Sequence, residues 1–347
     1  MAEYKDIKGY TIQVTDTDPI LYAGAWTSGG NLNTTRHSSA KGTTGIQTAA
    51  IASAGHPAQA VVEQYDGSAW SEVGDVNTGR NSAASCATSN TALVIAGGRS
   101  PNRSLTESFD GSSWTETGDL NLARYALAGA GTQTAGLAFA GNTPGTTADA
   151  ESWNGSAWTE VSDLNEGVGG VSGAGTQTAA FMVSGRTSPG STGCTANVES
   201  WNGSAWTETT DVNTKRGNTG SAGDTSLGIF FGGNSGSGQI ALTEKWDGTS
   251  WTEVGDLNTA RQYIGAAGAS ANLALGFGGN TPSVSAVTES WNGSAWSEVN
   301  DLSSATASSK GTPSSASTST LCSGGTPSGT DVEEWTASAA ISTVTTS

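Results

Sequence analysis

The sequence has few positive charges and no long apolar run. Only 14 of its 347 residues are Lys or Arg, against 31 Asp or Glu, which gives a formal net charge of −17. A chain of this charge repels phosphate backbones and anionic lipids. No segment approaches the roughly 18 consecutive apolar residues of a membrane-spanning helix. We therefore expect neither nucleic-acid binding nor membrane insertion.

Residues that commonly carry metal or redox chemistry are also scarce. The cysteines Cys86, Cys194 and Cys322 are odd in number, lie far apart and show no CxxC spacing, so neither a disulfide framework nor a zinc site is indicated. His37 and His56 are the two histidines, too few for a histidine-rich metal centre. No pairing of a nucleophile with a base is recognisable. The sequence predicts no enzymatic activity, no catalytic residue, no metal and no cofactor.

The residues that are abundant favour short strands and tight turns. Glycine accounts for 49 residues, only 13% of residues are charged, and no stretch shows the 3.6-residue spacing of an amphipathic helix. We therefore expect an all-β protein.

The stretch ESWNGSAWTEVSDLN at residues 151–165 recurs along the chain. Aligning the copies on the second tryptophan gives spacings of 44, 44, 44, 48, 45 and 45 residues. These seven tryptophans are Trp26, Trp70, Trp114, Trp158, Trp206, Trp251 and Trp296. Aligning on the Glu before the first aromatic also gives seven copies, at Glu63, Glu107, Glu151, Glu199, Glu244, Glu289 and Glu333. The two sets are out of phase at the chain ends, because Trp26 has no such Glu before it and Trp335 has no second Trp after it.

Each copy reads as four short strands. In residues 122–165 these are RYALAGAG, TAGLAFAGN, ADAESW and SAWTEV, with the hairpin signal Asn154-Gly155 between the last two. A four-stranded unit of about 44 residues, repeated radially, is typical of a β-propeller blade. The offset predicts a seven-bladed ring of antiparallel blades whose last blade is shared between about residues 20–33 and 304–335. Residues 1–19 would form an N-terminal arm, 20–335 the propeller and 336–347 a C-terminal tail.

The recurring order of Arg, strand, strand-Gly-Gly, aromatic, Trp and xLN turn resembles the kelch-type β-propeller over roughly residues 20–335. The resemblance implies a rigid scaffold with interaction surfaces on its loops. Five copies place an arginine after the xxN turn, at Arg36, Arg80, Arg124, Arg216 and Arg261. One interpretation is a basic ring that holds an anion. The interpretation we favour is that each arginine pairs with a third-strand Glu as a structural tie.

The loop between the second and third strands changes most among the copies, from GHPAQAVV to GRTSPGSTGCTANV. Loops on a rigid scaffold are common binding sites. We therefore expect a ligand-binding face there, with Arg103, Arg186, His56 and Gln239 from the loops and Tyr125 and Tyr263 from the channel mouth. The two tyrosines either stack on a sugar ring or pack at the first strand.

Residues 1–19, MAEYKDIKGYTIQVTDTDP, followed by AGAWTSGGNLNTTR, resemble the start of structural proteins carried on tailed-bacteriophage particles, especially marine ones. The resemblance implies a virion protein present in multiple copies, acting as a tail or fibre adsorption module or as a head decoration. Its partners would be other virion proteins and a host-surface glycan or protein. The alternative is an intracellular kelch-like scaffold for protein–protein interaction.

Overall fold

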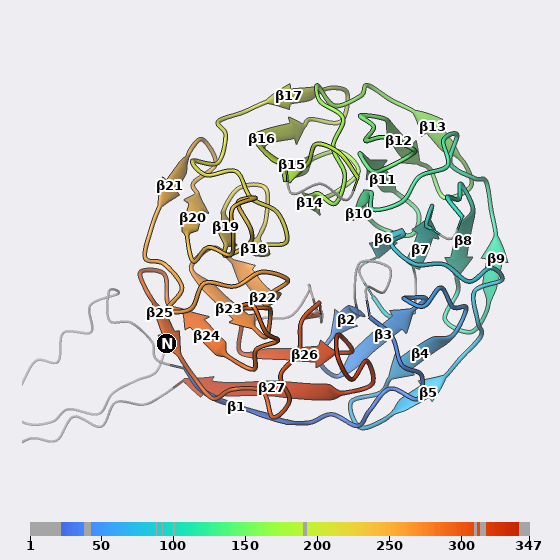
Figure 1. Ribbon diagram of the computed structural model, residues 1–347. Coiled ribbons are helices and arrows are strands. Elements are labelled where there is room, and N and C mark those ends of the chain that lie inside the picture. The colour runs from blue at the N-terminus through green and yellow to red at the C-terminus, as the bar shows by residue number, and fades with distance from the viewer. Residues whose placement is uncertain are drawn as a thin grey trace, which may run out of the picture.

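The computed structural model describes residues 22–37, 43–87, 89–91, 93–99, 101–189, 193–308, 311–312 and 317–339. The predicted arm at 1–19 lies outside these residues. Within them the regular elements are β-strands, numbered β1 to β27, arranged in seven sheets around a ring (Figure 1). None of the described segments forms a helix long and apolar enough to cross a membrane. The seven-bladed β-propeller predicted from the repeat is confirmed.

Six sheets have four antiparallel strands each, in sequential order. Blade 1 comprises β2 (Thr43–Ile46), β3 (Ala49–Ser53), β4 (Val62–Tyr65) and β5 (Trp70–Glu72). Blade 2 comprises β6 (Ala84–Ala87), β7 (Leu93–Ala96), β8 (Thr106–Phe109) and β9 (Trp114–Glu116). Blade 3 comprises β10 (Ala128–Gly131), β11 (Gly136–Phe139), β12 (Ala150–Trp153) and β13 (Trp158–Glu160). Blade 4 comprises β14 (Ser172–Gly175), β15 (Ala180–Arg186), β16 (Cys194–Trp201) and β17 (Trp206–Glu208). Blade 5 comprises β18 (Gly220–Gly223), β19 (Gly228–Phe231), β20 (Thr243–Trp246) and β21 (Trp251–Glu253). Blade 6 comprises β22 (Gly265–Ser270), β23 (Leu273–Phe277), β24 (Thr288–Trp291) and β25 (Trp296–Glu298).

The seventh sheet draws strands from both ends of the described chain. Its order is β1 (Tyr22–Ser28), β27 (Val332–Ala339) and β26 (Ser319–Ser323), and Trp26 lies opposite Trp335. The innermost strand expected in this blade falls partly on residues 309–310 and 313–316, outside the described residues. Because β27 continues to Ala339, the start of the tail predicted at 336–347 is instead part of a paired strand.

The hairpin between the third and fourth strands is held by an asparagine or aspartate side chain. In blade 3, Oδ1 of Asn154 accepts hydrogen bonds from the backbone nitrogens of Ser156 and Ala157, both at 3.0 Å. Gly155 has φ +96°, a conformation that glycine adopts without strain. The Asn-Gly signal thus marks a four-residue turn in which the Asn side chain replaces a backbone partner.

Glycine also ends the second strand of every blade, and all seven of these glycines have positive φ, between 101° and 158°. They are Gly55, Gly98, Gly141, Gly185, Gly233, Gly279 and Gly325. The chain turns sharply there into the variable loop, so all seven loops leave the ring on one side. We call this side the loop face.

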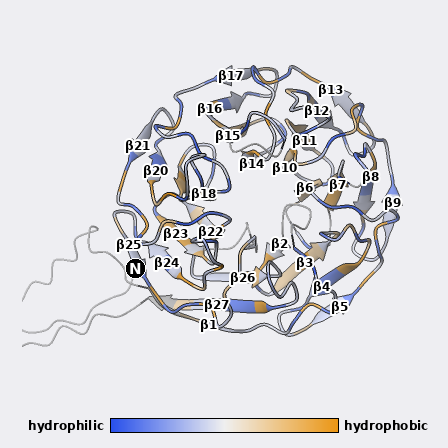
Figure 2. Cartoon of the chain, in the orientation of Figure 1, coloured by the Kyte–Doolittle hydropathy of each residue, from blue (hydrophilic) through white to orange (hydrophobic). Residues whose placement is uncertain are grey.

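Aromatic side chains fill the space between neighbouring blades. Trp153 and Trp158 face each other across the outer hairpin of blade 3, with ring centroids 5.2 Å apart. Phe139 of blade 3 contacts Trp206 of blade 4 at 4.8 Å. The second strands carry much of the apolar surface, whereas strands such as β4 and β8 are largely hydrophilic (Figure 2). Burying both faces of each sheet in this way requires a neighbour on both sides.

Candidate functional site

Five blades hold a buried arginine where the chain arrives from the preceding blade. Nη1 of Arg124 lies 2.8 Å from Oε1 of Glu151 on β12 of the same blade, and both side chains are at most 1% exposed. The other pairs are Arg36 with Glu63, Arg80 with Glu107, Arg216 with Glu244 and Arg261 with Glu289. Burial lowers the pKa of each arginine, and the carboxylate of its partner opposes that shift. The pairs support the structural interpretation over an anion-binding ring.

The same glutamates also anchor the connection between blades. Oε2 of Glu151 accepts from the backbone nitrogen and from Nδ2 of Asn121, both at 2.8 Å. In blade 4, where Val168 replaces the arginine, Glu199 still accepts from Nδ2 of Asn165 at 2.7 Å. The glutamate therefore binds the incoming chain even where no arginine is present.

On the loop face, one backbone bridge per blade joins the residue after the arginine position to the residue after the strand-ending glycine. The bridges are His37 with His56, Asn81 with Arg99, Tyr125 with Asn142, Gly169 with Arg186, Gly217 with Asn234, Gln262 with Asn280, and Ala307 with Thr326. We call these residues the mouth ring, because each bridge joins the segment before an innermost strand to the end of the second strand of the same blade or the segment after it.

The mouth ring differs in chemistry from the rest of the chain. It contains two arginines, two histidines, one tyrosine and five carboxamides, and none of its members is acidic. The chain as a whole carries a formal net charge of −17. Asn81 and Asn142 are buried, and the remaining polar side chains of the ring form a neutral to positive surface with hydrogen-bond donors on an acidic protein.

Polar contacts link the mouth ring across blades 4 to 6. Nη2 of Arg186 donates to Oδ1 of Asn218 at 3.0 Å, and Nδ2 of Asn218 donates to Oε1 of Gln262 at 3.2 Å. Nε2 of Gln239 approaches Oδ1 of Asn280 at 3.5 Å. Side chains from three blades are thus oriented by one another, which prepares a surface for hydrogen bonding to a ligand.

Two further contacts lie on the ring in blades 1 to 3. The guanidinium of Arg99 lies 4.9 Å from the centroid of the Tyr125 ring, a cation–π contact. The rings of His37 and His56 have centroids 4.6 Å apart, and burial together with the charge of His56 lowers the pKa of His37. His37 is therefore neutral at neutral pH.

The six predicted ligand-binding residues lie on the loop face, but only three of them are members of the mouth ring. His56, Tyr125 and Arg186 belong to the mouth ring itself. Gln239 contacts the ring through Asn280. Tyr263 follows Gln262, is 39% exposed and can contact a ligand, which differs from the packed alternative. Arg103 is half-buried and is not a member of the mouth ring. Its backbone carbonyl accepts a hydrogen bond from the backbone nitrogen of Arg124.

Sequence reasoning missed several residues of this surface. Arg99, Asn142, Asn218, Gln262 and Asn280 were not predicted. A usable signal was present, because ring members follow either the arginine position or the Gly that ends the second strand. Comparing residues at these two repeat positions, rather than comparing loop lengths, identifies all of them except Asn218, which stands one place after ring member Gly217.

Among the described residues, no group of three or more His, Cys, Asp or Glu is placed to hold a metal ion. Cys86, Cys194 and Cys322 are buried in different blades.

No protein-family model and no curated protein matches this sequence. Among solved structures, the fold is similar to that described as "Structure of YjhT", a propeller, with a TM-score of 0.58 and 14% sequence identity. The alignment covers 78% of this chain and 99% of the other. At this identity the likeness shows the fold alone: the chain is a β-propeller.

Proposed function

We propose that this chain is a non-enzymatic structural protein of a tailed-bacteriophage particle and that its mouth ring binds a host-surface glycan or protein. The observation that carries the binding role is the mouth ring itself. Its side chains change from blade to blade while the Arg–Glu pairs, turns and tryptophans around it repeat. A rigid scaffold with variable, preoriented side chains suits recognition.

The chemistry of the ring favours a glycan. Carboxamides donate and accept hydrogen bonds at once, as sugar hydroxyls do, and the exposed Tyr263 offers an aromatic face to a sugar ring. We expect each copy to bind weakly. Several copies on one particle would supply avidity.

The virion assignment rests on the resemblance of residues 1–19 and the segment after them to phage structural proteins. Mass spectrometry of separated heads and tails tests it. Recovery with tails supports an adsorption module, and recovery with heads supports a decoration.

Binding is tested on a glycan array with the protein displayed in multivalent form. Replacing both Asn218 and Gln262 with alanine should abolish the signal, because it removes the polar chain between blades 4 and 6. Thr159→Ala is the matched control, since Thr159 is exposed on β13, away from the ring. Equal binding by both variants would refute the assignment of the ring.

The alternative function is a kelch-type scaffold that binds a protein partner inside a cell. The recurring Arg, Gly-Gly and Trp positions favour it. Absence of the chain from both heads and tails would support this alternative over the virion role.

A further inference from the structure

A belt of backbone hydrogen bonds joins most neighbouring blades at the loop face. The nitrogens of Ala126, Gly170 and Tyr263 donate to the carbonyls of Ser82, Ala126 and Asn218 respectively, each at 2.8 Å. Within the described part of the chain, no equivalent bond joins Asn218 of blade 5 to Gly170 of blade 4. The belt is therefore open between these two blades.

The space around glycines of the second strands shows that blades 4 and 5 are also separated at the level of these strands. A Cβ built on Gly136 of blade 3 would lie 3.0 Å from Sγ of Cys86 in blade 2. The three atoms nearest to a Cβ on the equivalent Gly228 of blade 5 all belong to blade 5, the first at 3.5 Å. Blade 5 is thus not packed as tightly against blade 4 at this level as blade 3 is against blade 2.

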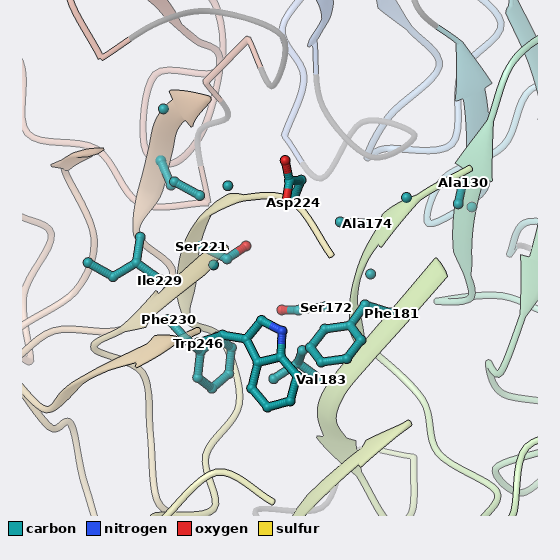
Figure 3. A pocket seen from close by; sticks show the side chains of 18 of the residues that line it. Ala130, Ser172, Ala174, Phe181, Val183, Ser221, Asp224, Ile229, Phe230 and Trp246 are labelled. Carbon is teal, nitrogen blue, oxygen red and sulfur yellow. The ribbon is translucent and has the colours of Figure 1, made fainter. Parts of the chain in front are cut away.

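The opening between β14 and β18 belongs to a cavity of about 440 Å³ that extends along the centre of the ring. Phe181 and Val183 of β15 and Phe230 and Trp246 of blade 5, each between 2% and 9% exposed, line the end of the cavity that lies between the two blades (Figure 3). Its walls come from the innermost strands of several blades, and the two that border the opening, β14 and β18, consist only of Gly, Ala and Ser. Volume and lining match those of small-molecule sites, which are concave, largely apolar and carry few polar groups.

One charge lies on the described lining, the carboxylate of Asp224. Its Oδ1 accepts from the backbone nitrogen of Ser226 at 2.7 Å and from that of Leu227 at 3.0 Å, so the turn fixes its position. Hydrogen bonds from the Ser226 hydroxyl and backbone lower the pKa of Asp224 and keep it ionised. In Figure 3, Ser172 and Ser221 are drawn between Asp224 and the aromatic side chains.

We propose that this junction cavity binds a small organic cation that carries an aromatic ring. The ring would lie in the opening between β14 and β18, against the small exposed parts of Phe181 and Trp246, and the ammonium group would face Asp224. An aromatic wall and one carboxylate attract such a cation, whereas an anion of the same shape meets the carboxylate unfavourably. The site is separate from the mouth ring, and the proposal does not depend on the proposed function.

The test is titration of the full chain with phenethylamine, followed by isothermal calorimetry, with 3-phenylpropionate as an anion of similar size. We expect saturable 1:1 binding of the amine and at least about tenfold weaker binding of the anion. Asp224→Asn should weaken amine binding by about threefold, in line with an ion pair to an exposed carboxylate. Asparagine keeps the Oδ1 acceptor of the turn. Asp110→Asn, which makes the same change in an outer hairpin, is the matched control and should leave binding unchanged.

Ala174→Leu fills the cavity from β14, where Ala174 is exposed, and should abolish binding of the amine without loss of folding, checked by circular dichroism. The proposal is wrong if the amine does not bind, or if amine and anion bind equally. It is also wrong if Asp224→Asn has no more effect than Asp110→Asn, or if folded Ala174→Leu binds as the unchanged protein does.

Discussion

The indole Nε1 of Trp158 in blade 3 donates a 2.9 Å hydrogen bond to Oγ1 of Thr106 in blade 2. The same bond joins Trp296 to Thr243 at 3.0 Å and Trp26 to Thr288 at 2.9 Å. In each case the threonine directly precedes the buried third-strand glutamate. The outer tryptophan of one blade is thereby fixed to the sheet of the blade before it.

In the other four blades the position before that glutamate is apolar, and the tryptophan Nε1 has no partner among the described residues. These tryptophans are Trp70, Trp114, Trp206 and Trp251, facing Val332, Val62, Ala150 and Val198. The identity of one residue thus decides whether each indole is hydrogen-bonded.

Thr106→Val should lower the free energy of unfolding by about 1–3 kcal/mol, because it leaves Nε1 of Trp158 buried without an acceptor. Urea denaturation measures the loss. The reverse change, Val62→Thr, offers an acceptor to Trp114 and should leave stability equal or raise it. A Thr106→Val protein as stable as the unchanged chain would show that the bond contributes nothing.

Arg124→Val should destabilise the protein by about 3–5 kcal/mol at neutral pH, because Glu151 would remain buried and charged without its partner. Valine itself is compatible with this position, as Val168 shows in blade 4. Adding Glu151→Gln should recover part of the loss. Denaturant titration of the single and double variants makes the comparison, and a double variant less stable than the single one would contradict the explanation.

The parts of the fold that repeat were predictable because local chemistry specifies them. Asn154 and Gly155 identify the outer hairpin, and Gly141 identifies the end of the second strand, each without knowledge of distant contacts. Repetition of these signals at a narrow spacing then indicates blades and their number. The extent of β27 was not predictable, because its last residues pair with β1 from the other end of the chain.

The site was predictable only in part, because its contacts depend on the position of each blade relative to its neighbours. Arg186 stands out in a long variable loop, but its partner Asn218 comes from the next blade and gives no local signal. The opening between β14 and β18 is likewise a relation between blades. Ser172–Gly175 (SGAG) differs from the closely packed Ala128–Gly131 (AGAG) only in its first residue, which gives no signal of the opening.

Acid should weaken the turns capped by aspartate. Hydrogen bonds from Ser113 and Ser112 lower the pKa of Asp110 to about 2, and those from Thr249 and Ser250 lower that of Asp247 to about 2. The unfolded value is about 3.9. A depressed folded pKa contributes stability that is present above the unfolded pKa and is lost as pH falls through the folded one.

The variant Asp110→Asn/Asp247→Asn should therefore lose less free energy of unfolding between about pH 4 and pH 2 than the unchanged protein. Asparagine preserves the turn, because Asn154 caps the equivalent hairpin with the same bonds. Denaturation curves at stepped pH provide the measurement. Asn154→Asp should steepen the acid loss, and parallel curves for all three proteins would refute the account.

Two glycine-to-alanine changes should have opposite effects because the blades are unequally spaced. A Cβ on Gly129 would lie 2.6 Å from the carbonyl oxygen of Ser85 in blade 2, so Gly129→Ala requires two backbones to move apart and should destabilise the ring by about 1–3 kcal/mol. A Cβ on Gly228 meets only ordinary contacts within blade 5, so Gly228→Ala should be neutral or stabilise by about 0.4–1 kcal/mol. Neither residue has positive φ, so backbone conformation does not confound the pair. Thermal and urea unfolding of both variants decide the matter: equal destabilisation would mean that blades 4 and 5 are as tightly packed as blades 2 and 3.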